Sequence, residues 1–211
     1  MKFNCEHLLS SKNYDTIESI KKQIVLGNTF NRDMKHVIGW KHRYNGEYKK
    51  TAAFTIDING SIHKHFDPKY QSNFLNDLIL DSKSIVILIE NDGWLTKNDK
   101  NNSFISWLGH IYNESDTVYE KKWRGYSYWA PYNKKQMDST VKLVKYLCNE
   151  FFIPIAAITH NTKVEYLEDY NGIVYKSNIG KDYTDVNPSF DFEYFIDNIN
   201  KNDNNYERKN K

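Results

Sequence analysis

The chain has 211 residues, and its 29 Lys and Arg nearly balance its 27 Asp and Glu, which leaves a formal net charge of +2. This length suits one domain with its own hydrophobic core, and the charge balance gives no electrostatic reason to expect a nucleic-acid partner. Residues 1–15 contain no apolar stretch of the signal-peptide type, and no run reaches the roughly 20 apolar residues of a membrane helix. A cytoplasmic product without a signal peptide is therefore expected.

The first part of the chain predicts a short helix followed by a buried strand. Asp15 is a candidate helix cap, and Ile17 and Ile20 follow it at helical spacing. Residues 24–26 then form an apolar run that ends at Gly27 and Asn28, as a buried strand would.

A hairpin and a second buried strand come next. Residues 52–58 and 61–66 read as two strands, with Asn59 and Gly60 as the turn between them. Residues 84–90 are almost all β-branched or apolar, which is typical of a central strand covered on both faces. This strand delivers Glu90 and Asn91 to its carboxyl end.

The segment from about 92 to 132 is rich in Trp and Tyr and has little regular pattern, so it reads as an insertion in the domain. Trp94 and Trp129 are among its aromatic side chains. Such rings can stack on sugars at a cleft, or they can pack the insertion onto the sheet. Both interpretations stay open at this point.

The last part of the chain predicts a helix, a strand and a further helix. Asn133 can cap a helix from residue 134 to about 152, which Pro154 stops. Residues 155–158 read as a short strand that is followed by Thr159 and His160. A final helix runs to about Ile199. The polar tail, residues 201–211, is expected to be disordered. Together these elements predict a single α/β domain, residues 1–200, with a central mixed β-sheet flanked by helices.

The order of these elements and the short motifs at their ends resemble the N-acetylmuramoyl-L-alanine amidase family, which includes phage lysozyme-type amidases and peptidoglycan recognition proteins. The resemblance covers residues 20–200. It is carried by IVLGNT at 24–29, TAAFTIDINGSI at 51–62, SIVILIEN at 84–91, PYNKKQ at 131–136, ITH at 158–160 and TDVNPSFDF at 184–192.

The resemblance implies a zinc site that activates water for attack on the bond between muramic acid and L-alanine. The family's three zinc ligands are a histidine at the end of the first strand, a second histidine at the end of the strand after the long helix, and an Asp or Cys in the segment before the last helix. The second matches His160 and the third matches Asp185. The first falls on Gly27, which has no side chain, or on Asn28 if the register slips by one, where an amide oxygen is a poor substitute for imidazole. Zinc is therefore the implied cofactor of a site that lacks one ligand.

The resemblance also implies catalytic and binding positions around that site. The acid/base carboxylate is expected on the strand of residues 84–90, where Leu88 stands at the matching position and Glu90 lies on the same face two residues later. The lysine that supports the oxyanion falls on Tyr183, with Lys181 two residues before it. The side chains of Asn28, Asn91, Trp94 and Trp129 are expected to line the cleft.

Three functions are compatible with these residues. The first is an endolysin-like amidase that cleaves peptidoglycan and reaches the cell wall after release from the producing cell. The second is a catalytically inactive relative that binds a muropeptide or another small ligand. The third is a protein-interaction module that uses the aromatic insertion, although the sequence identifies no protein partner. No metal ligands beyond His160 and Asp185 are predicted for the cleft.

Overall fold

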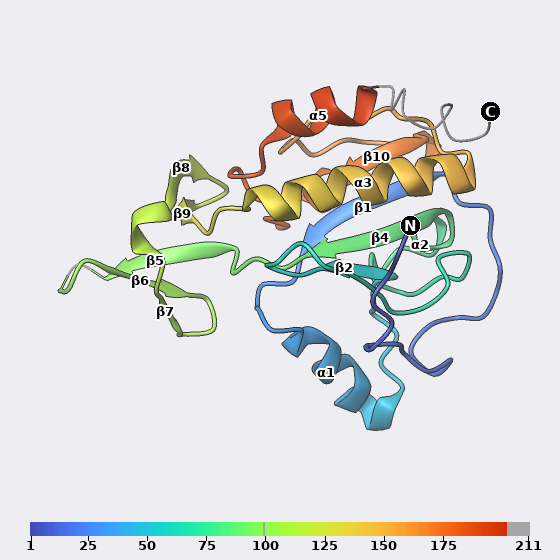
Figure 1. Cartoon of the computed structure of the whole chain (residues 1–211), viewed down its shortest axis with the longest axis horizontal. Coiled ribbons are helices and arrows are strands. Elements are labelled where there is room, and N and C mark those ends of the chain that lie inside the picture. Colours follow the sequence, from blue (N-terminus) through green and yellow to red (C-terminus); the bar gives the residue numbers. More distant parts are fainter. Residues whose placement is uncertain (99, 202–211) are drawn as a thin grey trace, which may run out of the picture.

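The computed structural model describes residues 1–98 and 100–201, and a five-stranded mixed sheet lies at its centre (Figure 1). The strand order is β10-β1-β4-β2-β3. Strands β10, β1, β4 and β2 run parallel, and β3 pairs with β2 in the opposite direction. The bounds are β1 Gln23–Asn28, β2 Phe54–Ile56, β3 Ile62–Lys64, β4 Ser84–Ile89 and β10 Gly172–Tyr175. The predicted fold class is confirmed.

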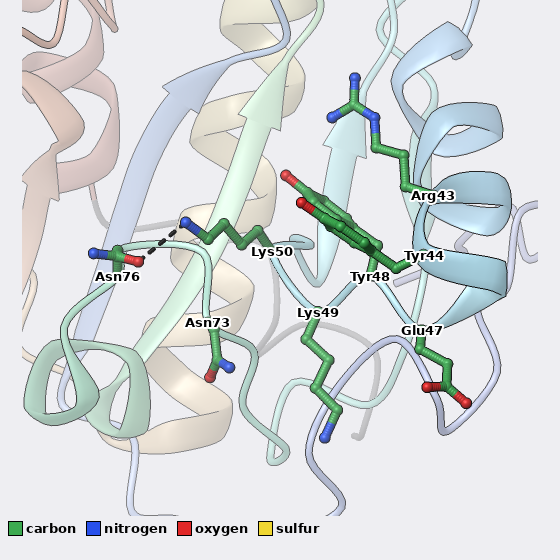
Figure 2. A pocket seen from close by; sticks show the side chains of 8 residues that line it. All are labelled: Arg43, Tyr44, Glu47, Tyr48, Lys49, Lys50, Asn73 and Asn76. Carbon is green, nitrogen blue, oxygen red and sulfur yellow. Dashed lines mark hydrogen bonds between the residues drawn. The ribbon is translucent and has the colours of Figure 1, made fainter.

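One face of this sheet is covered by short helices and loops. Helix α1, Lys35–His42, continues into the 3-10 turn η1, Arg43–Gly46. Figure 2 shows Arg43, Tyr44 and Glu47 to the right of the strands, with the long helix behind the strands. Helix α2, Leu78–Lys83, leads directly into β4.

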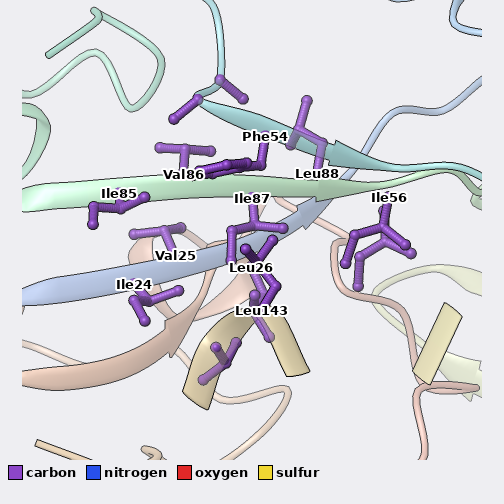
Figure 3. Packing of buried hydrophobic residues seen from close by; sticks show 14 of the residues in the cluster. Ile24, Val25, Leu26, Phe54, Ile56, Ile85, Val86, Ile87, Leu88 and Leu143 are labelled. Atoms are coloured by element: carbon purple, nitrogen blue, oxygen red, sulfur yellow. The ribbon is translucent and has the colours of Figure 1, made fainter. Parts of the chain in front are cut away.

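The opposite face is covered by α3, Lys134–Phe151, and by α5, Phe192–Asn200 (Figure 1). Asn133 caps α3 in a reciprocal box with Gln136, and the helix ends where Phe152 turns left-handed. The predicted helix is therefore confirmed together with its cap. Leu143 of α3 lies on one side of the sheet in Figure 3 and Leu88 of β4 points to the other.

Strands β1 and β4 form because their side chains are buried on both faces. Leu26 and Ile87 are fully buried, and they pair directly across the ladder. At about 25 cal/mol per Å² of apolar surface, such paired aliphatic side chains supply much of the driving force for this core. The loop between β2 and β3 turns at Gly60, which has a φ of 82°, while Asn59 does not adopt a positive φ.

The aromatic insertion forms a second sheet that projects to one side of the first (Figure 1). Its strand order is β7-β6-β5-β9-β8, and all of its pairs are antiparallel. The bounds are β5 Trp94–Asn98, β6 Ser103–Ser106, β7 Ile111–Tyr112, β8 Tyr119–Trp123 and β9 Tyr126–Trp129. The expectation of little regular structure was wrong, because short strands around a small core leave too weak an alternation to recognise.

Two further predictions were wrong. No helix forms among residues 1–22, because this segment pairs its backbone with residues 62–71 and leaves Ile17 and Ile20 exposed. Residues 155–158 are not a strand, since only Ala157 makes a bridge, to Ile173. The strand that follows α3 is instead β10.

The remaining helices are short. They are the 3-10 turns η2 Ser115–Thr117 and η3 Leu167–Asp169, and the helix α4 Lys176–Ile179. The predicted tail lies outside the described residues except for Lys201.

Candidate functional site

The carboxyl ends of β1, β4 and β10 bring Gly27, Leu88 and Lys176 together. Gly27 pairs with Leu88 in the ladder between β1 and β4. Leu26 pairs with Tyr175, the last residue of β10, so Lys176 follows beside Gly27. A Cβ atom on Gly27 would lie 3.2 Å from Leu88 Cδ2 and 3.7 Å from Lys176 Cδ. This cluster therefore faces away from α3, on the side of the sheet where Leu88 points (Figure 3).

Asp185 reaches the same point from the loop before α5. Its Oδ2 atom lies 3.7 Å from Lys176 Nζ and accepts a hydrogen bond from the backbone N–H of Asn28 at 3.2 Å. A Cβ on Gly27 would lie only 2.7 Å from that oxygen. The carboxylate of Asp185 and the side chain of Lys176 thus fill the space in front of Gly27. We call this group the lysine-aspartate site; it consists of Gly27, Asn28, Lys176 and Asp185.

The site places a buried carboxylate beside a largely buried ammonium. Asp185 is fully buried, and this burial raises the pKa of its carboxyl, while Lys176 and the Asn28 N–H act in the opposite direction. Lys176 Nζ also lies 4.7 Å from the ring centroids of Phe74 and of Tyr183. The ammonium is therefore held between one carboxylate and two aromatic faces.

Arg124 connects the second sheet to this site. It lies in the turn between β8 and β9, and its guanidinium donates to the backbone carbonyls of Gly180 at 2.7 Å and Ser177 at 2.8 Å, and also to that of Tyr183. These three carbonyls belong to the loop that runs from Lys176 to Asp185. The insertion thus positions the loop that carries both charged groups.

The ring of His160 hydrogen-bonds to the backbone of Val186, the residue after Asp185, and its Nε2 atom is buried without a hydrogen-bond partner among the described residues. Joint metal binding by His160 and Asp185 stays a prediction. The His160 ring stacks on Phe192 with centroids 5.5 Å apart and contacts Tyr175 and Phe190. Burial lowers the pKa of His160 to about 4. The strand after α3 that joins the central sheet is β10, and the residue that follows this strand is Lys176.

The predicted catalytic residues divide between the site and the scaffold. Tyr183 lies in the site, against the Lys176 ammonium, while Lys181 is exposed to solvent. Glu90 is buried and accepts hydrogen bonds from the backbone N–H groups of Met34 at 2.6 Å and Ile58 at 3.1 Å. Burial raises the pKa of Glu90, and these N–H groups oppose the rise. Its carboxylate therefore ties two loops to β4.

Asn91 and Trp129, which were predicted to line the cleft, are structural. Asn91 is buried and donates to the carbonyls of Ala130 and Pro131. Trp129 is fully buried and donates to the carbonyl of Lys121. Both predictions are wrong because the side chains are buried in the scaffold: Asn91 joins the end of β4 to the segment after β9, and Trp129 packs within the second sheet.

Asn28 and Trp94 remain candidates for contact with a ligand. Both polar atoms of the Asn28 side chain are buried and lack a hydrogen-bond partner among the described residues. Trp94 is half-buried and stacks on Tyr126 with ring centroids 4.4 Å apart. An unpaired buried amide is costly, so Asn28 is the more informative of the two.

A pocket of about 660 Å³ opens on the sheet face that carries the lysine-aspartate site (Figure 2). Arg43 lies over the ring of Tyr48 at 5.4 Å, and Lys50 donates to Asn76 Oδ1 at 3.0 Å. The segment 73–76 links the pocket to Lys176, because Phe74 lies under the ammonium. The lining residues are Arg43, Tyr44, Glu47, Tyr48, Lys49, Lys50, Asn73 and Asn76.

Sequence reasoning missed Lys176, Arg124 and the basic pocket. The signal for Lys176 was present as the apolar run Ile173–Tyr175 ahead of it, a pattern as strand-like as the one chosen at 155–158. No sequence signal identified Arg124, because its partners are backbone carbonyls some 53 to 59 residues away.

The architecture, a mixed sheet between helices with a candidate site at the carboxyl ends of its strands, is similar to that of solved peptidoglycan amidases. The structure of PlyL aligns with a TM-score of 0.56 at 13% identity over 95% of this chain and 98% of that one. A mutant endolysin from Bacillus subtilis aligns with a TM-score of 0.54 at 15% identity over 94% of this chain and 99% of that one. At such identities the likeness concerns the fold.

The amidase AmiD from E. coli, solved with the substrate anhydro-N-acetylmuramic acid-L-Ala-D-gamma-Glu-L-Lys, aligns with a TM-score of 0.54 at 13% identity over 92% of this chain and 66% of that one. The family model for N-acetylmuramoyl-L-alanine amidase matches residues 18–172, and the chain belongs to this family. Among curated protein sequences, none matches it.

The residues of the site do not fit the zinc ion that the family implies. A catalytic zinc needs three protein ligands with lone pairs, whereas the ends of β1 and β10 hold Gly27 and Lys176, with Asp185 beside them. Only Asp185 can donate to a metal, and the ammonium of Lys176 would repel one. Within residues 1–98 and 100–201, no group of three or more His, Cys, Asp and Glu side chains converges on a common point. In the same part of the chain, no helix has both the length and the apolar character required to cross a bilayer.

Proposed function

We propose that this protein binds a peptidoglycan fragment on the face of its central sheet and does not hydrolyse it by zinc chemistry. The observation that carries the proposal is the composition of the site, where a glycine and a lysine stand at two of the three ligand positions. Membership of the amidase family supports the class of ligand, and the misfit of the site to zinc favours binding over hydrolysis.

The basic pocket supports binding of an anionic glycopeptide. Arg43 has no acidic partner among the described ion pairs, and Lys50 donates to the amide oxygen of Asn76. Tyr44 and Tyr48 stack with their ring centroids 5.9 Å apart and offer flat apolar surface beside these cations. Cations suit the carboxylates of a peptide stem, and aromatic rings suit a sugar face.

Binding is tested by co-sedimentation with insoluble peptidoglycan and by calorimetry with a soluble muramyl peptide. We expect the wild-type chain to sediment with the wall. The double variant Arg43→Gln/Lys50→Gln should bind the soluble ligand about tenfold more weakly, since each charge contact at an open site is worth up to about 1 kcal/mol. The matched control is Lys97→Gln/Lys122→Gln, which removes two exposed charges from the second sheet. Failure of the wild type to bind either form of the ligand would overturn the proposal.

Hydrolysis is tested on the same samples by following free L-alanine amino groups. We expect no release above the level of a buffer blank, with or without added zinc. Zinc-dependent release that is lost in Asp185→Asn would show that the protein is an active amidase, and would contradict the second half of the proposal.

A further inference from the structure

The lysine-aspartate site contains its own cation. We propose that the ammonium of Lys176 takes the place of the metal ion, as a covalently attached positive charge that neutralises Asp185. The inference deepens the proposed function and rests on it for the absence of zinc chemistry. Its decisive tests nevertheless use zinc and protein stability, and need no peptidoglycan.

The position of Lys176 beside Gly27 supports this role. Gly27 and Lys176 stand side by side at the carboxyl ends of β1 and β10. Asp185 joins them from the loop before α5, with Oδ2 at 3.7 Å from the ammonium. The lysine thus reaches the carboxylate from one of the positions where a metal ligand is expected.

The space in front of Gly27 is filled by Lys176 and Asp185. A Cβ on Gly27 would come within 2.7 Å of Asp185 Oδ2 and within ordinary contact distance, 3.7 Å, of Lys176 Cδ. A larger side chain at position 27 therefore cannot coexist with Lys176 and Asp185 in their present places. The absence of a side chain at Gly27 and the length of Lys176 are complementary features of one arrangement.

The buried carboxylate of Asp185 also supports this role for Lys176. Asp185 has no exposed surface, so its carboxylate needs a nearby cation or must take up a proton. Among the described ion pairs, Lys176 is the cation that approaches it. Arg124 is a second positive group close to the site, and its guanidinium is bonded to three backbone carbonyls.

Two aromatic rings hold the Lys176 ammonium in place. The ammonium lies 4.7 Å from the ring of Phe74 and 4.7 Å from that of Tyr183, so aromatic faces from two separate loops hold it. A lysine that merely extended into solvent would not be enclosed in this way. Asp185 Oδ1 is buried and has no hydrogen-bond partner among the described residues.

The main experiment converts the internal cation into a metal site. The variants are Gly27→His/Lys176→His and the same pair combined with Asp185→Asn, compared with wild type. Zinc content is measured after equilibration with zinc and gel filtration. We expect less than about one tenth of an equivalent for wild type, about one equivalent for the double variant, and loss of that zinc when Asp185→Asn is added. One equivalent in the wild type that depends on Asp185 would overturn the inference, as would a folded double variant that takes up no zinc.

A second measurement covers the case in which the histidine variants do not fold. Thermal unfolding is compared for Lys176→Met, Asp185→Asn and the two together. A cation that neutralises Asp185 predicts that each single change lowers Tm by several degrees, because it leaves one buried charge or donor without its partner. The double variant should then lose clearly less than the sum of the two. Additive losses would mean that the two groups are not coupled, and would exclude the proposed role of Lys176.

Discussion

Two histidines, the half-buried His36 and the buried His65, are expected to make the stability of the protein depend on pH. Both rings donate to or accept from the hydroxyl of Thr55 at 2.9 Å, and burial lowers the pKa of each to about 3. In the unfolded chain a histidine titrates near 6.5. The folded state therefore binds fewer protons, so the stability from these groups is complete above pH 6.5 and is lost as the pH falls toward 3.

We expect His65→Gln to reduce this acid sensitivity. Each such histidine contributes a slope of about 1.4 kcal/mol per pH unit between these limits. Buried acids work in the opposite direction, since Asp81 has its pKa raised to about 6, so the difference between variant and wild type is the informative quantity. Urea denaturation at pH 7.5, 6 and 5 measures it. The exposed His110 provides the control His110→Gln, and equal slopes for all three proteins would refute the assignment.

At the scale of elements, the loop between β2 and β3 and the start of α3 depend on each other. Gly60 has a φ of 82°, and a Cβ there would lie 2.7 Å from the carbonyl oxygen of Lys135. Asn133 Nδ2 donates to the carbonyl of Ile58 at 2.7 Å, and Ser139 Oγ donates to that of Gly60 at 2.6 Å. The hairpin loop therefore packs closely against the first turns of the helix.

Gly60→Ala should destabilise the protein by about 2 to 3 kcal/mol, because the substitution combines an unfavourable φ with a backbone collision. Chemical denaturation measures the change. The neighbouring exposed residue gives the control Ser61→Ala, for which we expect a change within about 0.5 kcal/mol. A neutral Gly60→Ala variant would show that the loop can move away from α3 without cost.

At the scale of the whole molecule, Arg124 couples the second sheet to the site. We expect Arg124→Met to free the loop of residues 177–183, since three carbonyls lose their donor at once. Hydrogen exchange of the amides in this loop should become about tenfold faster or more, while amides of β1 and β4 keep their protection. Arg124→Lys should restore little, because one ammonium cannot span three carbonyls in the manner of a guanidinium. Unchanged exchange in Arg124→Met would show that the loop is held by other contacts.

The sequence predicted those elements that are determined by residues close to one another in the chain. The continuous apolar runs of β1 and β4, the turn at Gly60, and the Asn133 cap with its helical stripe each depend on neighbours within a few residues. The α/β class follows from their order, and Asp185 was recognised from the motif before the last helix.

The identity of the site was decided by tertiary structure. Two short apolar runs follow α3, at 155–158 and at 173–175, and nothing local distinguishes them. The choice was made by pairing, because only the second joins β1 in a continuous parallel ladder, where Gln23 also bonds the carbonyls of Leu167 and Tyr170. That register replaces His160 by Lys176 beside Gly27. Residue 27 is far from residues 176 and 185 in the chain, and only the alignment of strand ends can bring it into contact with them.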